Sequence, residues 1–442
     1  MKRREFIKYS AISAALLNST DSVAKGKFEC QYNPENDLIN KTTNIAVCGG
    51  GYAGLSIAKF LKELNPKLEV TVIEQKQNFI SCPYSNLWLG GIPYVSFEDL
   101  NFDYFGAVNK YKYSFVNEKI VKINRDEKLI YTTKTKVKYD YMIMACGIDY
   151  DYTKLYDSDI SKAQKSRQKT PAGLKPGSEH LALKRMIKNF KGGDFIISIP
   201  SSSYRCPPAP YERACMIANY FKQNNIDGRV VILDPRKKPA AKASKFLKAF
   251  NKYYSDFIDY RSLTNFKDID FDKKTIFVES FDKKELKYKT LEVKYEEASI
   301  IPPNKANSLV NIANLELYEN AWAKLRKPTF RSTSDEDVYV IGDAQGEYPY
   351  PKSAYMANSC AYIVAKEIVA RYKNETFDYK KNMPSNICYS MVTNKDAVFV
   401  SHTYKYKDNV KVNSYLSPIN EDAAKATKLW YKNFTKDIFG LL

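Results

Sequence analysis

Histidine is scarce in this sequence, because His180 and His402 are the only two among 442 residues. The eight cysteines form no Cys-x-x-Cys pair and no Cys-x-x-Cys-His motif, so neither a common zinc spacing nor a covalent c-type haem attachment is present. Neither histidine lies in a nucleophile motif, which disfavours a histidine-dependent hydrolytic triad. No run approaches the roughly twenty apolar residues that a membrane-spanning helix needs.

Glycine is also sparse, but four of the 17 glycines gather between positions 49 and 54. An apolar strand, 44–48, leads into this turn, and a helical pattern and a second apolar strand ending at Glu74 follow it. Gly49 permits the tight turn, Gly51 lets the backbone approach a pyrophosphate, and Gly54 lets the helix pack close to the strand. Glu74 is placed to accept hydrogen bonds from an adenosine ribose. The pattern predicts a dinucleotide-binding βαβ unit.

A second strand-end motif, Gly342-Asp343, follows the apolar stretch 337–341. Lys352 and a predicted helix over 353–371 come next. The combination suits an FAD whose ribitol hydroxyl binds Asp343 and whose pyrimidine edge faces the helix N-terminus. Lys352 is a candidate to hold negative charge at flavin N1 and O2.

A further βαβ unit is predicted from strands at 195–199 and 230–234 with a helix over 211–221. Its connecting turn, 200–210, contains four prolines and no glycine. Proline has no backbone N–H group and cannot line a phosphate cradle. If a related enzyme binds NAD(P)H at this turn, this chain is predicted to have lost that binding site.

The N-terminal residues, 1–24, resemble a twin-arginine export signal, which predicts a periplasmic protein; the alternative is a disordered basic N-terminus. The formal net charge of +19 suits an acidic partner protein or an anionic membrane surface, or reflects a solvated lysine-rich surface. The basic residues are spread along the chain and match no nucleic-acid-binding module, so we expect no nucleic-acid partner.

These features predict an α/β chain with two Rossmann-like domains and a C-terminal α+β interface domain, an arrangement that resembles the flavoproteins of the glutathione-reductase type. The expected divisions are a signal peptide (1–24), a linker (25–41), the first part of an FAD domain (42–155), a central NAD(P)-like domain without a glycine-rich loop (156–298), the second part of the FAD domain (299–375) and the interface domain (376–442).

Several motifs, in this order, resemble the flavoprotein subunit of flavocytochrome c sulfide dehydrogenase, a relative of sulfide:quinone oxidoreductase. They are Gly49–Gly54, Cys82, Arg205-Cys206-Pro207-Pro208, Pro210-Tyr211-Glu212-Arg213, Ile301-Pro302-Pro303, Ile341-Gly342-Asp343-Ala344, Pro351-Lys352-Ser353, Ala357-Asn358-Ser359, Cys388-Tyr389-Ser390 and the aromatic C-terminal stretch. The resemblance implies FAD bonded through its 8α-methyl group to Cys82, where Pro83-Tyr84 departs from the family pattern. It also implies a redox-active disulfide between Cys206 and Cys388, and a proton acceptor at Glu212. The alternative for Cys82 is a small buried thiol without a chemical role. The alternative for Glu212 is an acidic residue that stabilises a helix N-terminus.

The implied activity is FAD-dependent oxidation of sulfide to polysulfide or sulfur, because hydrosulfide is a soft nucleophile that attacks disulfides. A separate c-type cytochrome subunit, docked by the C-terminal segment in a heterodimer, is the implied electron acceptor. Membrane contact is expected to be peripheral at most. Two alternatives remain: sulfide:quinone oxidoreductase, and a catalytically inactive flavoprotein that scaffolds a haem subunit.

Overall fold

The structure is a computed structural model that describes residues 43–441. The predicted signal peptide (1–24), the predicted linker (25–41) and Cys30 lie outside the described residues. The described chain is a mixed α/β fold with two parallel sheets, which confirms the predicted fold class.

The first sheet is parallel and has the strand order β21-β9-β1-β2-β5. Its strands are β1 (Asn44–Cys48), β2 (Glu69–Ile73), β5 (Ser114–Val116), β9 (Tyr141–Met144) and β21 (Val338–Val340). Strand β1 is central, with β2 on one side and β9 on the other. The strand order therefore reverses at β1, which creates a topological switch point at the carboxyl end of the sheet. Such a switch point is where open α/β sheets bind ligands. The last strand, β21, comes from a distant part of the chain and pairs with β9.

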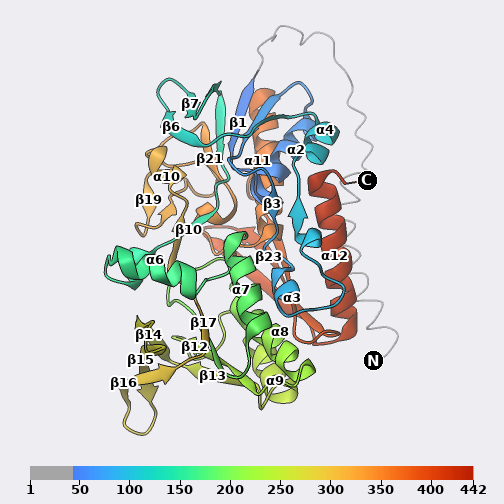
Figure 1. The fold of residues 1–442 in the computed structure, drawn as a ribbon. Coiled ribbons are helices and arrows are strands. Elements are labelled where there is room, and N and C mark those ends of the chain that lie inside the picture. Colours follow the sequence, from blue (N-terminus) through green and yellow to red (C-terminus); the bar gives the residue numbers. More distant parts are fainter. Residues whose placement is uncertain (1–42, 442) are drawn as a thin grey trace. The chain divides into compact units, whose positions relative to one another are not determined.

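Two helices, α2 (Tyr52–Leu64) and α11 (Ala354–Tyr372), pack against each other beside this sheet (Figure 1). Both begin at its carboxyl end, α2 after the glycine turn and α11 after the Gly-Asp motif. The N-cap of α11 is Ser353, whose hydroxyl accepts a hydrogen bond from the Met356 backbone N–H at 3.1 Å. The cap fixes where the helix starts and aims its N-terminus at the switch point.

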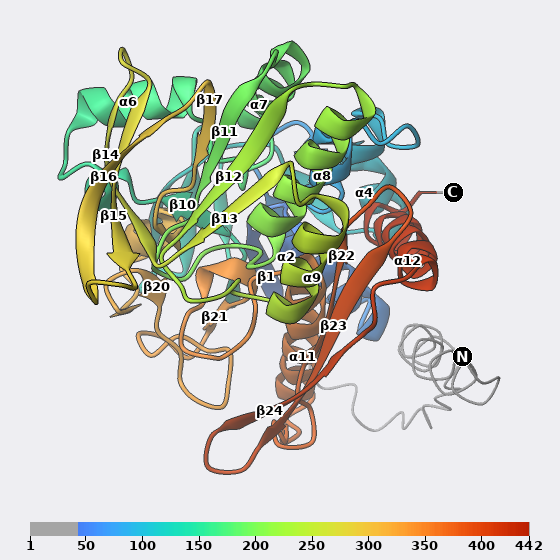
Figure 2. The same ribbon diagram turned by 90° about the horizontal axis from the view of Figure 1, so that it is seen from below.

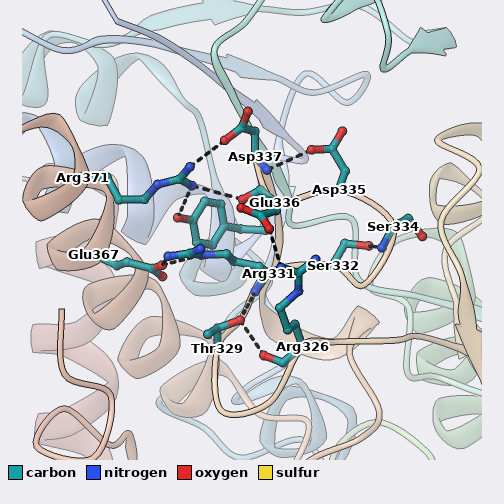
Figure 3. A network of polar contacts seen from close by, with 11 residues as sticks. Arg326, Thr329, Arg331, Ser332, Ser334, Asp335, Glu336, Asp337, Glu367 and Arg371 are labelled. Carbon is teal, nitrogen blue, oxygen red and sulfur yellow. Dashed lines mark hydrogen bonds and ion pairs between the residues drawn. The ribbon is translucent and has the colours of Figure 1, made fainter. Parts of the chain in front are cut away.

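A polar network ties β21 to α11 (Figure 3). Arg331 donates to the buried carboxylate of Glu367 at 2.6 Å, and Arg371 donates to Asp337 at 2.8 Å. Arg371 also donates to the hydroxyl of Tyr339, within β21, at 3.0 Å. Removing one partner of a buried ion pair would leave an unpaired buried charge, which lowers the stability of the fold. The network therefore holds the strand and the helix in a fixed register.

The second sheet is also parallel, with the order β13-β12-β11-β17. Its strands are β11 (Gly193–Ser198), β12 (Gly228–Asp234), β13 (Ile258–Ser262) and β17 (Glu297–Ile300), and its helices are α7 (Ser178–Asn189), α8 (Ala209–Gln223) and α9 (Ala243–Tyr253). Figure 2 shows an antiparallel sheet beside it, formed by β14 (Thr264–Asp270), β15 (Thr275–Asp282) and β16 (Lys287–Lys294).

The C-terminal part consists of an antiparallel sheet and the long helix α12 (Glu421–Phe439). The strands are β22 (Ser385–Met391), β23 (Ala397–Tyr406) and β24 (Val410–Leu416). Helix α12 turns its aromatic face inward: Tyr431 stacks on Tyr84 at 4.1 Å between ring centroids, and Phe439 stacks on Phe102 at 4.3 Å. Lysines occupy its exposed face, at positions 425, 428, 432 and 436.

Shorter elements connect these units. They are β3 (Phe79–Ile80), α3 (Ser85–Leu89), η2 (Glu98–Leu100), β4 (Asn101–Phe102), α4 (Phe105–Tyr111), β6 (Ile120–Asn124), β7 (Leu129–Thr132), β8 (Lys136–Lys138), β10 (Ile148–Tyr150), α5 (Tyr152–Leu155), α6 (Ile160–Lys169), β18 (Asn304–Ala306), α10 (Leu309–Ile312), β19 (Leu317–Tyr318), β20 (Trp322–Ala323) and η3 (Gly342–Ala344). Across residues 43–441, no helix combines the length and apolarity needed to cross a bilayer.

Candidate active site

A cavity of about 290 Å³ lies at the switch point of the first sheet and extends to the N-terminal part of α8 and to β22. Ten of the eleven residues that the sequence singled out line it, and Gly54 packs behind the turn. The lining residues are Gly49, Gly51, Glu74, Cys82, Cys206, Glu212, Gly342, Asp343, Lys352 and Cys388. The structure therefore brings the predicted dinucleotide motifs and the predicted sulfur chemistry to one place.

The glycine turn has the geometry of a phosphate cradle. Gly49 has a φ of +118°, which side-chain-bearing residues rarely adopt. A Cβ on Gly54 would lie 1.8 Å from the carbonyl oxygen of Gly49, so only glycine lets α2 approach β1 this closely. At Gly51 a Cβ would meet nothing within 4 Å, which leaves open cavity at the start of α2. An anion placed there would meet the positive end of the helix.

The two acidic residues of the dinucleotide motifs differ in their contacts. The Glu74 carboxylate accepts the backbone N–H groups of Gly50 and Lys76, each at 2.9 Å, and is fixed at the end of β2. Asp343 forms an ion pair with Arg205, whose Nε donates to the carboxylate at 2.6 Å. The sequence motifs do not reveal this partner, because it comes from the other half of the chain. One Asp343 carboxylate oxygen is thus already engaged.

Lys352 is a buried cation under the start of α11. Its ammonium donates to the carbonyl oxygens of Asp343, at 2.9 Å, and Gln345, and lies 3.6 Å from the centroid of the Trp322 ring. Burial lowers the pKa of Lys352 to about 7, and the Asp343 carboxylate opposes that shift. The side chain therefore changes charge readily, and an anionic group beside it would keep it protonated.

Cys206 lies in the loop that connects β11 to α8 and has a strained backbone. Its φ is +54°, a left-handed conformation that costs a non-glycine residue roughly 1–2 kcal/mol. Its backbone N–H donates to the Lys352 carbonyl at 2.9 Å, and Pro207 and Pro208 follow it into α8. Burial raises the pKa of the Cys206 thiol, and the neighbouring Cys388 raises it further.

Cys388 reaches the same cavity from β22, and Cys82 from the loop before α3. All three cysteines are free thiols in the structure. Burial raises the pKa of Cys82, and Arg205 and Arg213 offset part of that effect. Cys48, Cys215 and Cys360 are fully packed among hydrophobic side chains, as expected for thiols with no chemical role.

Glu212 lies in the first turn of α8, where it is partly buried and lines the cavity. Its two carboxylate oxygens accept from the Asn86 side chain and from the backbone N–H of Met391, each at 2.8 Å. Burial raises the pKa of Glu212, whereas the hydrogen bond from Asn86 and the charge of Lys242 lower it. A carboxyl group balanced in this way is suited to take up and release a proton.

The turn between β11 and α8 offers carbonyl oxygens where a dinucleotide cradle would offer N–H groups. Arg236 donates to the carbonyls of Pro200, at 2.9 Å, and Ser201, at 3.1 Å. Asp234, at the end of β12, is fully buried and accepts from the hydroxyls of Tyr211, at 2.6 Å, and Tyr260, at 3.0 Å. Protein side chains therefore satisfy the polar groups at the carboxyl end of this sheet.

Comparison with known proteins assigns three parts of the chain. Residues 180–293 match the family described as the central part of the sulfide dehydrogenase [flavocytochrome c] flavoprotein chain, and 381–439 match the flavin-binding part of flavocytochrome c sulphide dehydrogenase. Residues 43–168 match the pyridine nucleotide-disulphide oxidoreductases. The flavoprotein chain of sulfide dehydrogenase [flavocytochrome c] from Chlorobaculum thiosulfatiphilum is 47% identical over 45 residues, which are 10% of this chain and 94% of that sequence. The chain belongs to the flavocytochrome c sulfide dehydrogenase flavoprotein family.

Sulfide:quinone oxidoreductases are also similar to this member of the family. The mitochondrial enzyme of Dictyostelium discoideum is 22% identical over 398 residues, which are 86% of this chain and 84% of that protein. The structure of the enzyme from Aquifex aeolicus superposes with a TM-score of 0.72 at 19% identity, covering 90% of this chain and 92% of that one. At this identity the structural likeness establishes the fold.

The residues present fit FAD. The open space beside Gly51, the fixed Glu74 carboxylate and the N-terminus of α11 line one continuous cavity, as the phosphates, ribose and pyrimidine edge of FAD require. The family's flavin-binding region, 381–439, covers all of β22 and α12, which supply further lining residues. The family is one of FAD-dependent oxidoreductases, as the sequence indicated.

Sequence reasoning missed three residues of this site. Arg205 pairs with Asp343, Arg213 donates to the carbonyl of Ala172 at 2.7 Å from inside the core, and Lys242 contacts Cys388 at 3.5 Å. Arg205 and Arg213 belong to the two motifs around Cys206 and Glu212 that resemble the family. No sequence pattern marks Lys242, since it is one of many lysines in its segment.

Proposed function

We propose that this chain oxidises sulfide through a disulfide between Cys206 and Cys388 and passes the electrons, through FAD, to a separate c-type cytochrome. The observation that carries the proposal is that both cysteines line the cavity shared by the glycine turn and Asp343. The family assignment supports sulfide as the substrate class.

The chemistry of the chain's own residues begins with hydrosulfide attacking one sulfur of the disulfide. A new S–S bond forms, the Cys206–Cys388 bond breaks, and its electron pair remains on the other cysteine as a thiolate. Glu212 accepts the proton released when the persulfide ionises. FAD, when bound, supplies the two-electron acceptor for this thiolate and persulfide pair.

The remaining polar residues would position and hold the cofactor. Lys352 places a cation beneath the start of α11, where charge at the pyrimidine edge would be stabilised. Cys82 lines the cavity and is proposed to bond the 8α-methyl group of FAD. The lysine face of α12 supports docking of an acidic partner subunit there. Export by a twin-arginine route to the periplasm completes the proposal.

The decisive experiment is an anaerobic titration of the purified protein with sulfide. We expect bleaching of the FAD absorbance with one sulfide per two electrons, followed by faster reoxidation by cytochrome c than by a soluble quinone. Intact mass after denaturation should show FAD still attached and residues 1–24 removed. An FAD spectrum that sulfide leaves unchanged would refute the activity, and release of all FAD on denaturation would refute the Cys82 linkage alone.

Glu212→Gln should lower the rate of sulfide-driven FAD reduction by about 10²–10⁴-fold at neutral pH, because the variant lacks the proton acceptor. The pKa of Glu212 is raised, so the wild-type carboxylate becomes protonated as the pH falls through that raised value. The ratio of wild-type to variant rate should therefore shrink towards acidic pH. Stopped-flow measurements over pH 5–9 test this, with Glu292→Gln, at an exposed position on β16, as control. A ratio that does not change with pH would assign Glu212 a structural role.

Sulfide:quinone oxidoreductase activity is the second candidate. The long match to the D. discoideum enzyme supports it, as does an apolar edge where Phe105 is 75% exposed and Leu441 is 40% exposed. Gly106 packs against the carbonyl of Phe439, so these two side chains are carried by contacting segments. Faster reoxidation by quinone than by cytochrome c in the titration above would favour this candidate.

A further inference from the structure

Lys242 is a buried ammonium group with a sulfur as its neighbour. Its side chain is 6% exposed, and its Nζ lies 2.7 Å from the hydroxyl of Ser390 and 3.5 Å from the Sγ of Cys388. Within residues 43–441, no carboxylate lies within 4.0 Å of this nitrogen. A buried cation needs a counter-charge. The Glu212 carboxyl group interacts with Lys242 electrostatically without forming an ion pair, and Cys388 is the ionisable group in contact with the ammonium nitrogen.

The backbone holds Lys242 in place for this contact. The residue is the N-cap of α9 with a φ of +53°, and its carbonyl accepts the N–H groups of Lys245 and Phe246. The preceding loop is tied to α8, since the Ala240 N–H donates to the Tyr211 hydroxyl at 2.9 Å. A left-handed conformation at a lysine is unfavourable and persists where the surroundings impose it.

The lysine lies on one side of the proposed disulfide. Strand β22 alternates its side chains, so Cys388 and Ser390 point the same way, and Lys242 contacts both. Cys206 has no comparable contact with a cation among the described hydrogen bonds, although the charge of Lys242 reaches it. The two sulfurs are therefore electrostatically unequal.

We propose that Lys242 is the counter-ion of the Cys388 thiolate and so directs the sulfur of the substrate to Cys206. Hydrosulfide attacks Cys206 Sγ and forms a new S–S bond, while the Cys206–Cys388 bond breaks and leaves its electron pair on Cys388 Sγ. The products are a Cys206 persulfide and a Cys388 thiolate paired with the ammonium. Thiol–disulfide exchange favours expulsion of the better-stabilised thiolate, which gives the direction. The direction of cleavage rests on the proposed function, whereas the ion pair does not.

The ion pair is tested on the reduced, FAD-loaded protein by alkylation with iodoacetamide at a series of pH values, followed by peptide mass mapping. In Lys242→Met the pH midpoint for alkylation of Cys388 should rise by about one unit relative to wild type, since a nearby opposite charge favours the thiolate. Lys242→Arg should stay near wild type. Lys248→Met, an exposed lysine on the same helix, is the matched control.

The midpoint is informative because altered access changes the rate of alkylation but not the pH at which the thiolate forms. The other titratable groups that interact with Cys388 or with Lys242 are Cys206, Glu212 and His402, and all of them are retained in these variants. Equal midpoints in Lys242→Met and wild type would overturn the proposal, whether or not the protein oxidises sulfide.

The direction of attack is tested with sulfite, which cleaves a disulfide and leaves a stable S-sulfonate on the attacked sulfur. We expect the S-sulfonate on Cys206 and an alkylatable thiol on Cys388 in wild type, and a mixture in Lys242→Met. An S-sulfonate mainly on Cys388 of the wild-type protein would refute the direction. If no disulfide forms after oxidation, the proposed function fails, and the alkylation result alone decides the role of Lys242.

Discussion

Replacing either Cys206 or Cys388 with serine is expected to slow sulfide-driven reduction of FAD by on the order of 10³-fold or more. A serine hydroxyl cannot form the S–S bond that hydrosulfide must cleave, so the first bond-making step disappears. The two single variants and the double variant should be about equally slow, because the two sulfurs act as one unit. Stopped-flow spectroscopy of the FAD band measures the rate.

Cys215→Ala is the matched control, because this thiol is fully buried on α8, near Cys206 in the chain, and lies outside the cavity lining. Its activity should remain close to wild type. Reduction of each variant by dithionite shows that FAD is bound and able to accept electrons. Wild-type rates in Cys206→Ser would refute the disulfide mechanism while leaving the fold and cofactor assignment intact.

Gly54→Ala is expected to abolish stable FAD binding. The added Cβ would lie 1.8 Å from the carbonyl oxygen of Gly49, a backbone atom that cannot move without displacing β1 or α2. Overpacking of this kind costs about 1–3 kcal/mol or more, and here it also opens the phosphate cradle. Both the FAD-to-protein ratio and the free energy of unfolding of the apoprotein should fall.

Gly51→Ala separates cofactor binding from stability. Its φ of −82° suits alanine, and a Cβ there would meet no protein atom within 4 Å. The apoprotein should therefore unfold in the same denaturant range as wild type, while the methyl group occupies cavity space and the FAD-to-protein ratio falls. If the Gly51→Ala protein kept its full FAD content, the pyrophosphate would have to bind elsewhere in the cavity.

The local patterns of the sequence predicted the two parallel sheets well. The turn at Gly49 and the strand end at Asp343 are each encoded within a few residues, because turn chemistry and strand periodicity are local. The lack of N–H donors in the proline-rich turn after β11 could likewise be predicted from the local sequence. Strand bounds differ from the predictions by one or two residues, as at β11 and β12, since fraying ends carry no strong signal.

Long-range partners could not be predicted in the same way. Arg205 and Asp343 form an ion pair across the cavity, and Lys242 meets Cys388 only because α9 and β22 converge. No periodicity relates such residues, and in a lysine-rich chain the sequence does not distinguish Lys242 from its exposed neighbours. The same holds for α12, whose aromatic residues Tyr431 and Phe439 stack on Tyr84 and Phe102, far away in the sequence.

The sheet that carries the glycine turn is finished by β21, which pairs with β9 from far along the chain. Until residues beyond 340 have been synthesised, β9 keeps an unpaired edge and Asp343 does not yet exist. We therefore expect a chain that ends before β21 to bind the cofactor poorly, even when its first half has folded. Binding of FAD should therefore follow the synthesis of β21 and of the Gly-Asp motif, rather than the folding of the first half alone.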